Sequence, residues 1–205
     1  MKLIKYYFII FILCFPYYLF SQIPSTREFT LPQSDSLFNS KIISLDNINL
    51  AAFWIENSKL YFSKTSDYGI NWNPATHLLP AVTFNNTTFY TITVTNTGRI
   101  ILIYKNNDVF ITYSDDNGES FSNSQGINIP SGFATNNYKL TKSYSGDLYF
   151  SYTKGGSGVY YVKSGDNGES WGSEILVRSN GIARGIIASP DGKLHAFYYL
   201  AENNV

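Results

Sequence analysis

The chain has 205 residues, enough for one domain with a sizeable hydrophobic core. Hydrophobic residues make up 44% of it and charged residues only 15%, which excludes an intrinsically disordered chain. Fifteen Lys and Arg balance fifteen Asp and Glu, so the basic excess of a nucleic-acid-binding surface is missing and we expect no nucleic-acid partner.

Residues 1–22 have the features of a secretory signal peptide. Two lysines precede the apolar run YYFIIFILCFPYYLF, and small and polar residues follow it. Pro16 interrupts this run, which is shorter than the roughly 20 residues of a membrane-spanning helix, although an uncleaved N-terminal anchor is an alternative. We therefore expect a secreted or cell-surface protein with no membrane span after cleavage. Cys14 would leave with the signal, so we expect no disulfides.

Residues 23–40 are interpreted as a lead-in segment, and from residue 41 onward the sequence repeats. Turn glycines recur at Gly98, Gly146 and Gly192, each followed by an apolar, β-rich run: IILIY, LYFSY and LHAFYY. The first repeat is less regular. Each repeat predicts four short antiparallel strands, called A to D in chain order, joined by Gly, Asn and Asp turns. The repeats span residues 41–80, 88–130, 136–180 and 183–205.

A polar octapeptide lies between strands C and D of each of the first three repeats. We call these octapeptides the first, second and third box: TSDYGINW (65–72), SDDNGESF (114–121) and SGDNGESW (164–171). We expect the Asp of each box to close its turn by accepting hydrogen bonds from the backbone N–H groups one and two residues on. The glycine suits a positive φ, and the final aromatic residue fills a gap beside a neighbouring strand. The repeated Asp is therefore interpreted as a turn-closing residue and not as a catalytic acid.

The boxes share the pattern Ser/Thr-x-Asp-x-Gly-x-x-Trp/Phe, which resembles the Asp-box, or bacterial neuraminidase repeat, of sialidase-like β-propellers. The matching residues are Thr65, Asp67, Gly69, Trp72, Ser114, Asp116, Gly118, Phe121, Ser164, Asp166, Gly168 and Trp171. The resemblance covers about residues 41–205 and implies an all-β propeller of four-stranded antiparallel blades, of which this chain would hold about three and a half. A closed ring of about six blades is implied, so further blades would come from a longer chain or from self-association. In the family the Asp-boxes stabilise the fold on the face opposite the substrate site.

On that opposite face, the starts of strands A and the B–C loops are the places to expect function. Counting eight residues back from each turn glycine gives Tyr90, Tyr138 and Arg184, with a position near Ser40 in the first repeat. Six residues beyond the glycines stand aromatic residues that either stack on sugars or pack between blades, namely Tyr104, Tyr152 and Tyr198, matched by Trp54 in the first repeat. Both sets are candidate binding residues for glycans or glycoproteins.

Sialidases similar to this chain hold the substrate carboxylate with three arginines and use an Asp as acid/base and a Tyr nucleophile activated by Glu. The family's first arginine lies in an Arg-Ile-Pro run, where this chain reads LFNSKIIS (37–44). Arg99 falls in an A–B turn on the wrong face, so Arg184 is the candidate for carboxylate binding, with a solvated or salt-bridged strand-end residue as the alternative, and no catalytic residue is assigned. Glu56 and Asp108, near the B–C loops, are an acid/base pair or simply solvated turn residues.

Two functions remain open from the sequence. The first is a secreted, sialidase-like propeller that is non-catalytic and binds glycans or proteins or acts as a scaffold. The alternative is an exo-sialidase or related glycoside hydrolase whose catalytic set is completed beyond Val205. His77 and His195 lack metal-ligand spacing, so we expect neither a metal nor another cofactor.

Overall fold

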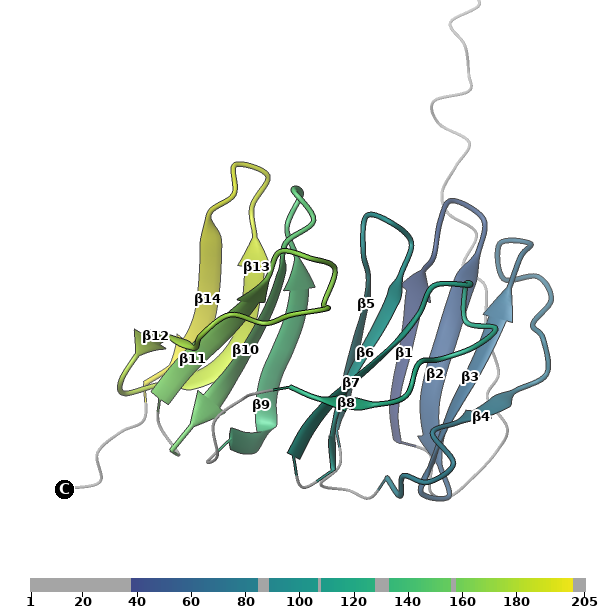
Figure 1. Ribbon diagram of the computed structural model, residues 1–205, viewed down its shortest axis with the longest axis horizontal. Coiled ribbons are helices and arrows are strands. Elements are labelled where there is room, and N and C mark those ends of the chain that lie inside the picture. Colours follow the sequence, from purple (N-terminus) through teal and green to yellow (C-terminus); the bar gives the residue numbers. More distant parts are fainter. Residues whose placement is uncertain (1–37, 85–88, 107, 128–132, 156–157, 201–205) are drawn as a thin grey trace, which may run out of the picture. The chain divides into compact units, whose positions relative to one another are not determined.

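The computed structural model describes residues 38–84, 89–106, 108–127, 133–155 and 158–200 (Figure 1). All of them belong to one compact unit, Leu31–Val205. Within the described residues every regular element is a strand. The predicted signal peptide, residues 1–22, lies outside the described residues, whereas the last part of the predicted lead-in already belongs to a strand that begins at Phe38.

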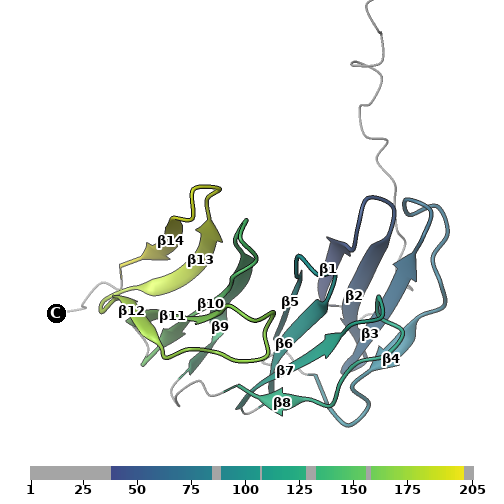
Figure 2. The same cartoon turned by 45° about the horizontal axis from the view of Figure 1, so that its top comes forward.

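The described strands form four antiparallel sheets, which we number in chain order (Figures 1 and 2). The first sheet contains β1 (Phe38–Ser44), β2 (Leu50–Glu56), β3 (Lys59–Thr65) and β4 (Thr76–Leu78). The second contains β5 (Tyr90–Val94), β6 (Ile100–Asn106), β7 (Asp108–Ser114) and β8 (Gln125–Gly126). The third contains β9 (Phe133–Lys142), β10 (Leu148–Lys154), β11 (Gly158–Ser164) and β12 (Ile175–Arg178). The fourth pairs β13 (Ile182–Ala188) with β14 (Leu194–Tyr199).

Tight turns separate the A and B strands at the predicted glycines. Gly98, Gly146 and Gly192 have φ of 86°, 97° and 83°, a region that only glycine adopts without strain. The strands that follow are rich in Ile, Leu, Phe and Tyr, which favour extended, half-buried backbone. Three sheets carry their strands in the simple order A-B-C-D, so the predicted all-β fold of four-stranded antiparallel blades is confirmed.

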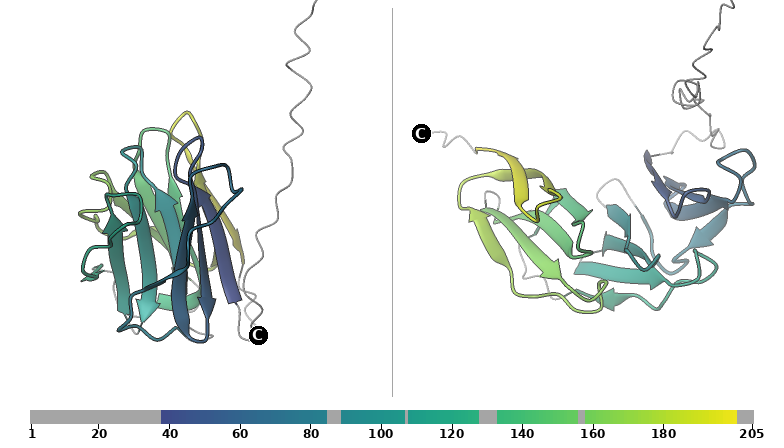
Figure 3. Two further views of the ribbon diagram at one scale, coloured as in Figure 1. Left: turned by 90° about the vertical axis from the view of Figure 1, so that its right-hand side faces the viewer. Right: turned by 90° about the horizontal axis from the view of Figure 1, so that it is seen from above.

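The first three sheets pack face to face, and β6 of the middle sheet alternates its side chains between the two neighbours. Ile100, Leu102 and Tyr104 of β6 join the core shared with the first sheet, whereas Ile101 and Ile103 join the core shared with the third. The A strands also contact one another in order, β1 with β5, β5 with β9 and β9 with β13 (Figure 3). The starts of these four strands are therefore brought together, although they are far apart in the sequence.

The three boxes form nearly identical turns. In the second box the Ser114 hydroxyl donates to Asp116 Oδ1 (2.7 Å) and accepts from the Gly118 N–H (2.8 Å). Asp116 Oδ1 also accepts from the Ser120 N–H at 2.9 Å, and Asp166 and Asp67 accept from the equivalent N–H groups. The expectation that Asp binds the N–H groups one and two residues on was wrong. The turn places two successive residues at positive φ after the Asp, which swings the N–H of the fourth residue toward the carboxylate.

The glycine of a box has a second role, at the contact between sheets. A Cβ on Gly118 would lie 2.3 Å from Cζ of Phe62, which belongs to the first sheet. A Cβ on Gly168 would lie 2.7 Å from Cδ1 of Ile101 in the second sheet. The box aromatic lies close by, since the Phe121 ring packs edge-on against Phe62 with centroids 6.0 Å apart. The boxes therefore help to join consecutive sheets.

Candidate functional site

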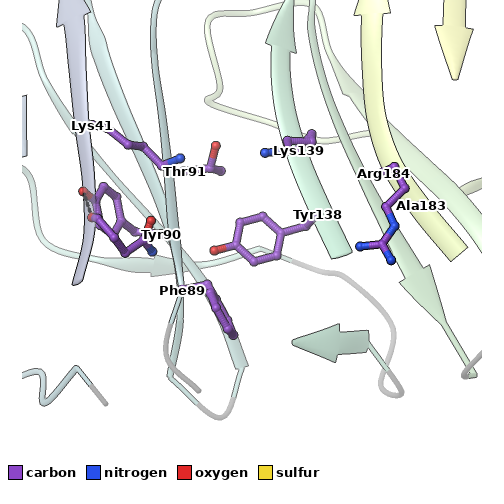
Figure 4. A pocket seen from close by; sticks show the side chains of 9 residues that line it. Lys41, Phe89, Tyr90, Thr91, Tyr138, Lys139, Ala183 and Arg184 are labelled. Atoms are coloured by element: carbon purple, nitrogen blue, oxygen red, sulfur yellow. Dashed lines mark hydrogen bonds between the residues drawn. The ribbon is translucent and has the colours of Figure 1, made fainter. Parts of the chain in front are cut away.

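A pocket of about 270 Å³ lies where the A strands begin, on the side of the sheets away from the box turns (Figure 4). It collects side chains from all four sheets: Asn39, Lys41, Phe89, Tyr90, Thr91, Tyr138, Lys139, Ala183 and Arg184. Tyr90, Tyr138 and Arg184, which were expected at the strand starts, are therefore brought together, although Tyr138 is the sixth residue of β9. The fourth position is filled by Lys41 and Asn39, which flank the expected Ser40.

Tyr90 forms the floor of the pocket and is only 1% exposed. Its hydroxyl donates to the backbone carbonyl of Asn39 (2.5 Å) and lies 2.9 Å from the carbonyl of Phe53. Burial raises the pKa of this phenol, so it stays protonated at neutral pH. Tyr90 is thus a rigid hydrogen-bonding anchor between the first two sheets.

Tyr138 stands beside Tyr90 on the third sheet. Its ring packs edge-on against Phe89 and tilts against Phe150, each with centroids 5.8 Å apart. Burial, followed by the neighbouring Tyr90 phenol, raises the pKa of Tyr138. Figure 4 shows its hydroxyl directed toward the Tyr90 side of the pocket. Tyr138 therefore offers a protonated phenol and an aromatic edge, and not a ready phenolate.

Three cationic side chains, Lys41, Lys139 and Arg184, line the same pocket. Lys41 Nζ lies 5.9 Å from the centre of the Tyr90 ring, and the Arg184 guanidinium stacks 4.6 Å from the centre of the Tyr199 ring. Burial, and then the positive charge of Lys139, lowers the pKa of Lys41. Of the described residues that line the pocket, none is acidic. Like charges at one site repel each other, so the pocket is electrostatically suited to an anion.

The B-strand aromatics lie elsewhere. Trp54, Tyr104 and Tyr152 are at most 3% exposed, and Tyr104 and Tyr152 pack in the cores between consecutive sheets. The sugar-stacking interpretation is therefore corrected for these three rings, because a sugar cannot reach a buried face. Tyr198 is 39% exposed and lies at the edge of the fourth sheet, outside the pocket.

A tyrosine–glutamate pair does occur in the third sheet, but not in the pocket. The Tyr152 hydroxyl donates to Glu174 Oε2 (3.0 Å), and Lys154 Nζ lies 2.6 Å from Glu174 Oε1. Burial and the Glu174 charge raise the pKa of Tyr152, while the Lys154 ammonium lowers the pKa of Glu174. Tyr152 is fully buried, and the hydrogen-bonded cluster of Tyr152, Lys154 and Glu174 connects β10 to the segment that precedes β12.

The other polar candidates are also dispersed. Glu56 accepts a long hydrogen bond from Trp54 Nε1 (3.4 Å), and Asp108 begins β7 as an exposed residue. Neither lines the pocket. The His77 ring packs against Tyr61, and the His195 ring lies 3.3 Å from the Ser189 hydroxyl. No group of three or more potential metal ligands occurs in the described part of the chain.

Sequence reasoning missed Lys41 and Lys139, and a bulge accounts for Lys41. Register shifts occur between Phe38 and Lys41 in β1 and between Ala183 and Gly185 in β13. Such bulges bend a strand, so that neighbouring residues turn toward the same side and a strict alternation fails. The pairs Tyr90–Thr91 and Tyr138–Lys139 also line the pocket together, although β5 and β9 pair regularly at these residues. A lysine next to a predicted pocket tyrosine was the available signal.

No protein-family profile and no curated protein matches the sequence. Among solved structures, a protein of unknown function from Dyadobacter fermentans DSM 18053 aligns with a TM-score of 0.57 and 13% identity, over 79% of this chain and 56% of that one. A PL25 polysaccharide lyase, an ulvan lyase bound to -[GlcA(1-4)Rha3S]-, aligns with a TM-score of 0.53 and 16% identity, over 76% and 44%. The chain thus spans about half the length of these proteins. At such identities the likeness shows a shared fold alone.

Sialidases are also among the matched structures. NanB from Streptococcus pneumoniae aligns with a TM-score of 0.46 and 16% identity, over 60% of this chain and 19% of that one, a likeness too distant to assign the family. In the described residues we find no helical segment with the length and apolar character that a membrane crossing requires.

Proposed function

We propose that this protein is an exported, sialidase-like propeller module that binds an acidic sugar without cleaving it. The observation that carries the proposal is the pocket at the A-strand starts, where Lys41, Lys139 and Arg184 meet two tyrosines and no acidic residue among the described lining. Export is supported by the signal-like residues 1–22. The three boxes support the relationship to sialidase-like propellers.

The chemistry of the pocket fits a carboxylate or sulfate attached to a sugar ring. Arg184 can offer a two-pronged guanidinium, while the lysines add point charges that need no fixed direction. The aromatic rings of Phe89 and Tyr138 supply apolar surface for the C–H face of a sugar. A volume of about 270 Å³ is near the lower end of ligand pockets, roughly 300–1,000 Å³, which suits a single ring. The ulvan lyase matched above is bound to a saccharide that carries glucuronate and sulfate.

The groups that surround the pocket support a role without turnover. Glycosidic bond cleavage requires a proton donor and a nucleophile or base on opposite sides of the bond. The described lining offers no carboxylic acid, and the raised pKa values of Tyr90 and Tyr138 disfavour a phenolate nucleophile. An exo-sialidase would need carboxylates and further arginines from residues other than those described.

Two measurements on the mature protein test this proposal. Oligosaccharides that carry a carboxylate or sulfate should bind at least about tenfold more tightly than their neutral counterparts, since one charged hydrogen bond is worth about 1.5–3 kcal/mol. Lys139→Gln should weaken that binding, whereas Lys59→Gln, at an exposed lysine outside the pocket, should not. A fluorogenic sialoside should remain intact. Turnover of that sialoside that disappears in Arg184→Ala would establish the hydrolase instead.

A further inference from the structure

The first and second sheets are joined by a charged contact that involves a box. Lys64 is the residue directly before the first box. Its ammonium contacts the Glu119 carboxylate and lies 3.4 Å from the Asn117 carbonyl oxygen, both in the second box. The side chain of Lys64 is only 21% exposed, so it is held at the contact between the sheets. A cation on one sheet therefore binds the box of the next sheet.

The second and third sheets repeat this contact with a different cation. Arg99 Nη1 lies 3.2 Å from the Glu169 carboxylate and 3.4 Å from the Asn167 carbonyl oxygen, the third-box equivalents of Glu119 and Asn117. The Arg99 guanidinium also donates to the Asp115 carboxylate, from Nε to Oδ1 at 2.6 Å and from Nη2 to Oδ2 at 3.0 Å. The residue before the second box is Tyr113, and its ring lies under Arg99 at 4.2 Å. The cation thus comes from the residue before strand B and not from the end of strand C, whereas the two groups that it contacts occupy equivalent positions in the box of the next sheet.

The third sheet carries a cation at the same place. Lys163 directly precedes the third box, as Lys64 precedes the first. Its ammonium lies 2.9 Å from Asp147, which stands at the position of Arg99 after the turn glycine, and the Lys163 side chain is 46% exposed. The box that Lys163 would bind belongs to strand C of the fourth sheet, which is not among the described strands.

The fourth sheet has an open edge on that side. The B strands β2, β6 and β10 each pair with two neighbours, whereas β14 pairs only with β13 among the described strands. Its aromatic residues remain accessible, with Phe197, Tyr198 and Tyr199 at 56%, 39% and 44% exposed. Their equivalents in the third sheet, Ser151, Tyr152 and Thr153, are at most 2% exposed. A depression of about 500 Å³ follows these aromatic residues along β14.

We propose that the β14 edge and Lys163 together form a docking site for an extended strand that ends in an Asp-box bearing a glutamate. The strand pairs with β14 through backbone hydrogen bonds and covers its aromatic side chains. The glutamate of the box, three residues after its Asp, binds Lys163 as Glu119 binds Lys64. The site continues two interfaces that already exist between the sheets, with the same charge pairing.

The segment 108–121, DVFITYSDDNGESF, has both parts of this ligand. It forms β7 in the second sheet and runs without interruption into the second box. Val109, Ile111 and the other inward residues of β7 are buried against neighbouring sheets, as the docked strand would be. A synthetic peptide of this sequence is therefore a suitable probe, and the same peptide with Glu119→Gln differs only by the charge that Lys163 would meet.

The experiment measures the binding of the fluorescent peptide to the mature protein by anisotropy. The wild-type pair should bind. Glu119→Gln in the peptide and Lys163→Met in the protein should each weaken binding about fivefold, as expected for an exposed charge pair, and together should weaken it no further. Lys59→Met is the matched control, because this exposed lysine begins β3 of the first sheet, away from β14 and Lys163, and it should have no effect.

Four results would overturn the proposal. The peptide could fail to bind a monomeric protein, or a scrambled peptide could bind equally well. Binding could also be insensitive to both Glu119→Gln and Lys163→Met. Finally, light scattering could reveal a dimer that Phe197→Ser converts to a monomer, in which case a second copy occupies the edge instead of a strand with a box.

Discussion

Gly118 lies where the second box meets the first sheet, and replacing it with alanine tests that contact. Gly118 has a φ of 87°, and Gly98, in the A–B turn of the same sheet, has a φ of 86°. Alanine at either position suffers the same left-handed strain, about 1–2 kcal/mol. Both substitutions also reduce the entropy of the unfolded chain equally, so that effect cancels between them.

The surroundings of the two glycines differ. A Cβ on Gly118 would lie 2.3 Å from the ring of Phe62, whereas a Cβ on Gly98 would meet no atom within 4 Å. Phe62 is only 4% exposed and is enclosed by the core of the first two sheets, so its ring cannot simply move into solvent. Overpacking of this kind costs about 1–3 kcal/mol. We therefore expect Gly118→Ala to lose about 1–3 kcal/mol more unfolding free energy than Gly98→Ala.

Urea unfolding followed by tryptophan fluorescence measures both variants, with slopes compared to verify that unfolding remains two-state. The loss of unfolding free energy for Gly168→Ala should lie between the losses for Gly118→Ala and Gly98→Ala, because the added Cβ would meet the flexible Cδ1 end of Ile101. Equal losses for Gly118→Ala and Gly98→Ala would refute the argument that the box glycine is needed for the approach of two sheets.

Three further predictions concern the boxes and the pocket. Tyr68 has a φ of 61° where the other boxes use Asn117 and Asn167, so Tyr68→Asn should stabilise the protein by about 0.5–1 kcal/mol in the same urea assay; a loss of stability would contradict this. Hydrogen bonds from Asn71 and Thr65 lower the pKa of Asp67 to about 2, below its usual value of roughly 4, so its contribution is present above pH 4 and is lost as the pH falls toward 2. The difference in unfolding free energy between wild type and Asp67→Asn should therefore shrink as the pH falls from 4 to 2, and a difference that stays constant would contradict this role of Asp67. Because the pKa of Lys41 is lowered, affinity for an acidic sugar should decline at a lower pH than an ordinary lysine would give, and Lys41→Arg should remove that decline.

The boxes were readable from the sequence because local turn chemistry determines them. The Ser or Thr hydroxyl, the Asp carboxylate and the glycine interact within a few residues, so the pattern alone predicts the turn. The contact of Gly118 with Phe62 was not predictable in this way. It depends on how two sheets pack, and 56 positions separate the residues (118 − 62).

The pocket was predicted in part. Tyr90, Tyr138 and Arg184 stand at the same count from the turn glycines; the hairpins pair regularly at Tyr90 and Tyr138, whereas Arg184 lies at a register shift in β13. Lys41 enters through a bulge in β1 that no residue pattern predicted, and Lys139 lines the pocket beside Tyr138 although β9 pairs regularly there. Trp54, Tyr104 and Tyr152 share an equally regular register, yet they are buried. Periodicity reveals which residues are equivalent, and packing decides whether they face a ligand or a neighbouring sheet.

The central claim is that the pocket at the A-strand starts recognises negative charge on a sugar. Calorimetric titration of two oligosaccharides that differ only by one carboxylate, into wild type and Arg184→Gln, tests this most directly. We predict that the acidic sugar binds at least about tenfold more tightly than the neutral one, and that Arg184→Gln removes most of this difference. Equal affinities of the two sugars for the wild type, or a preference that Arg184→Gln leaves intact, would contradict it.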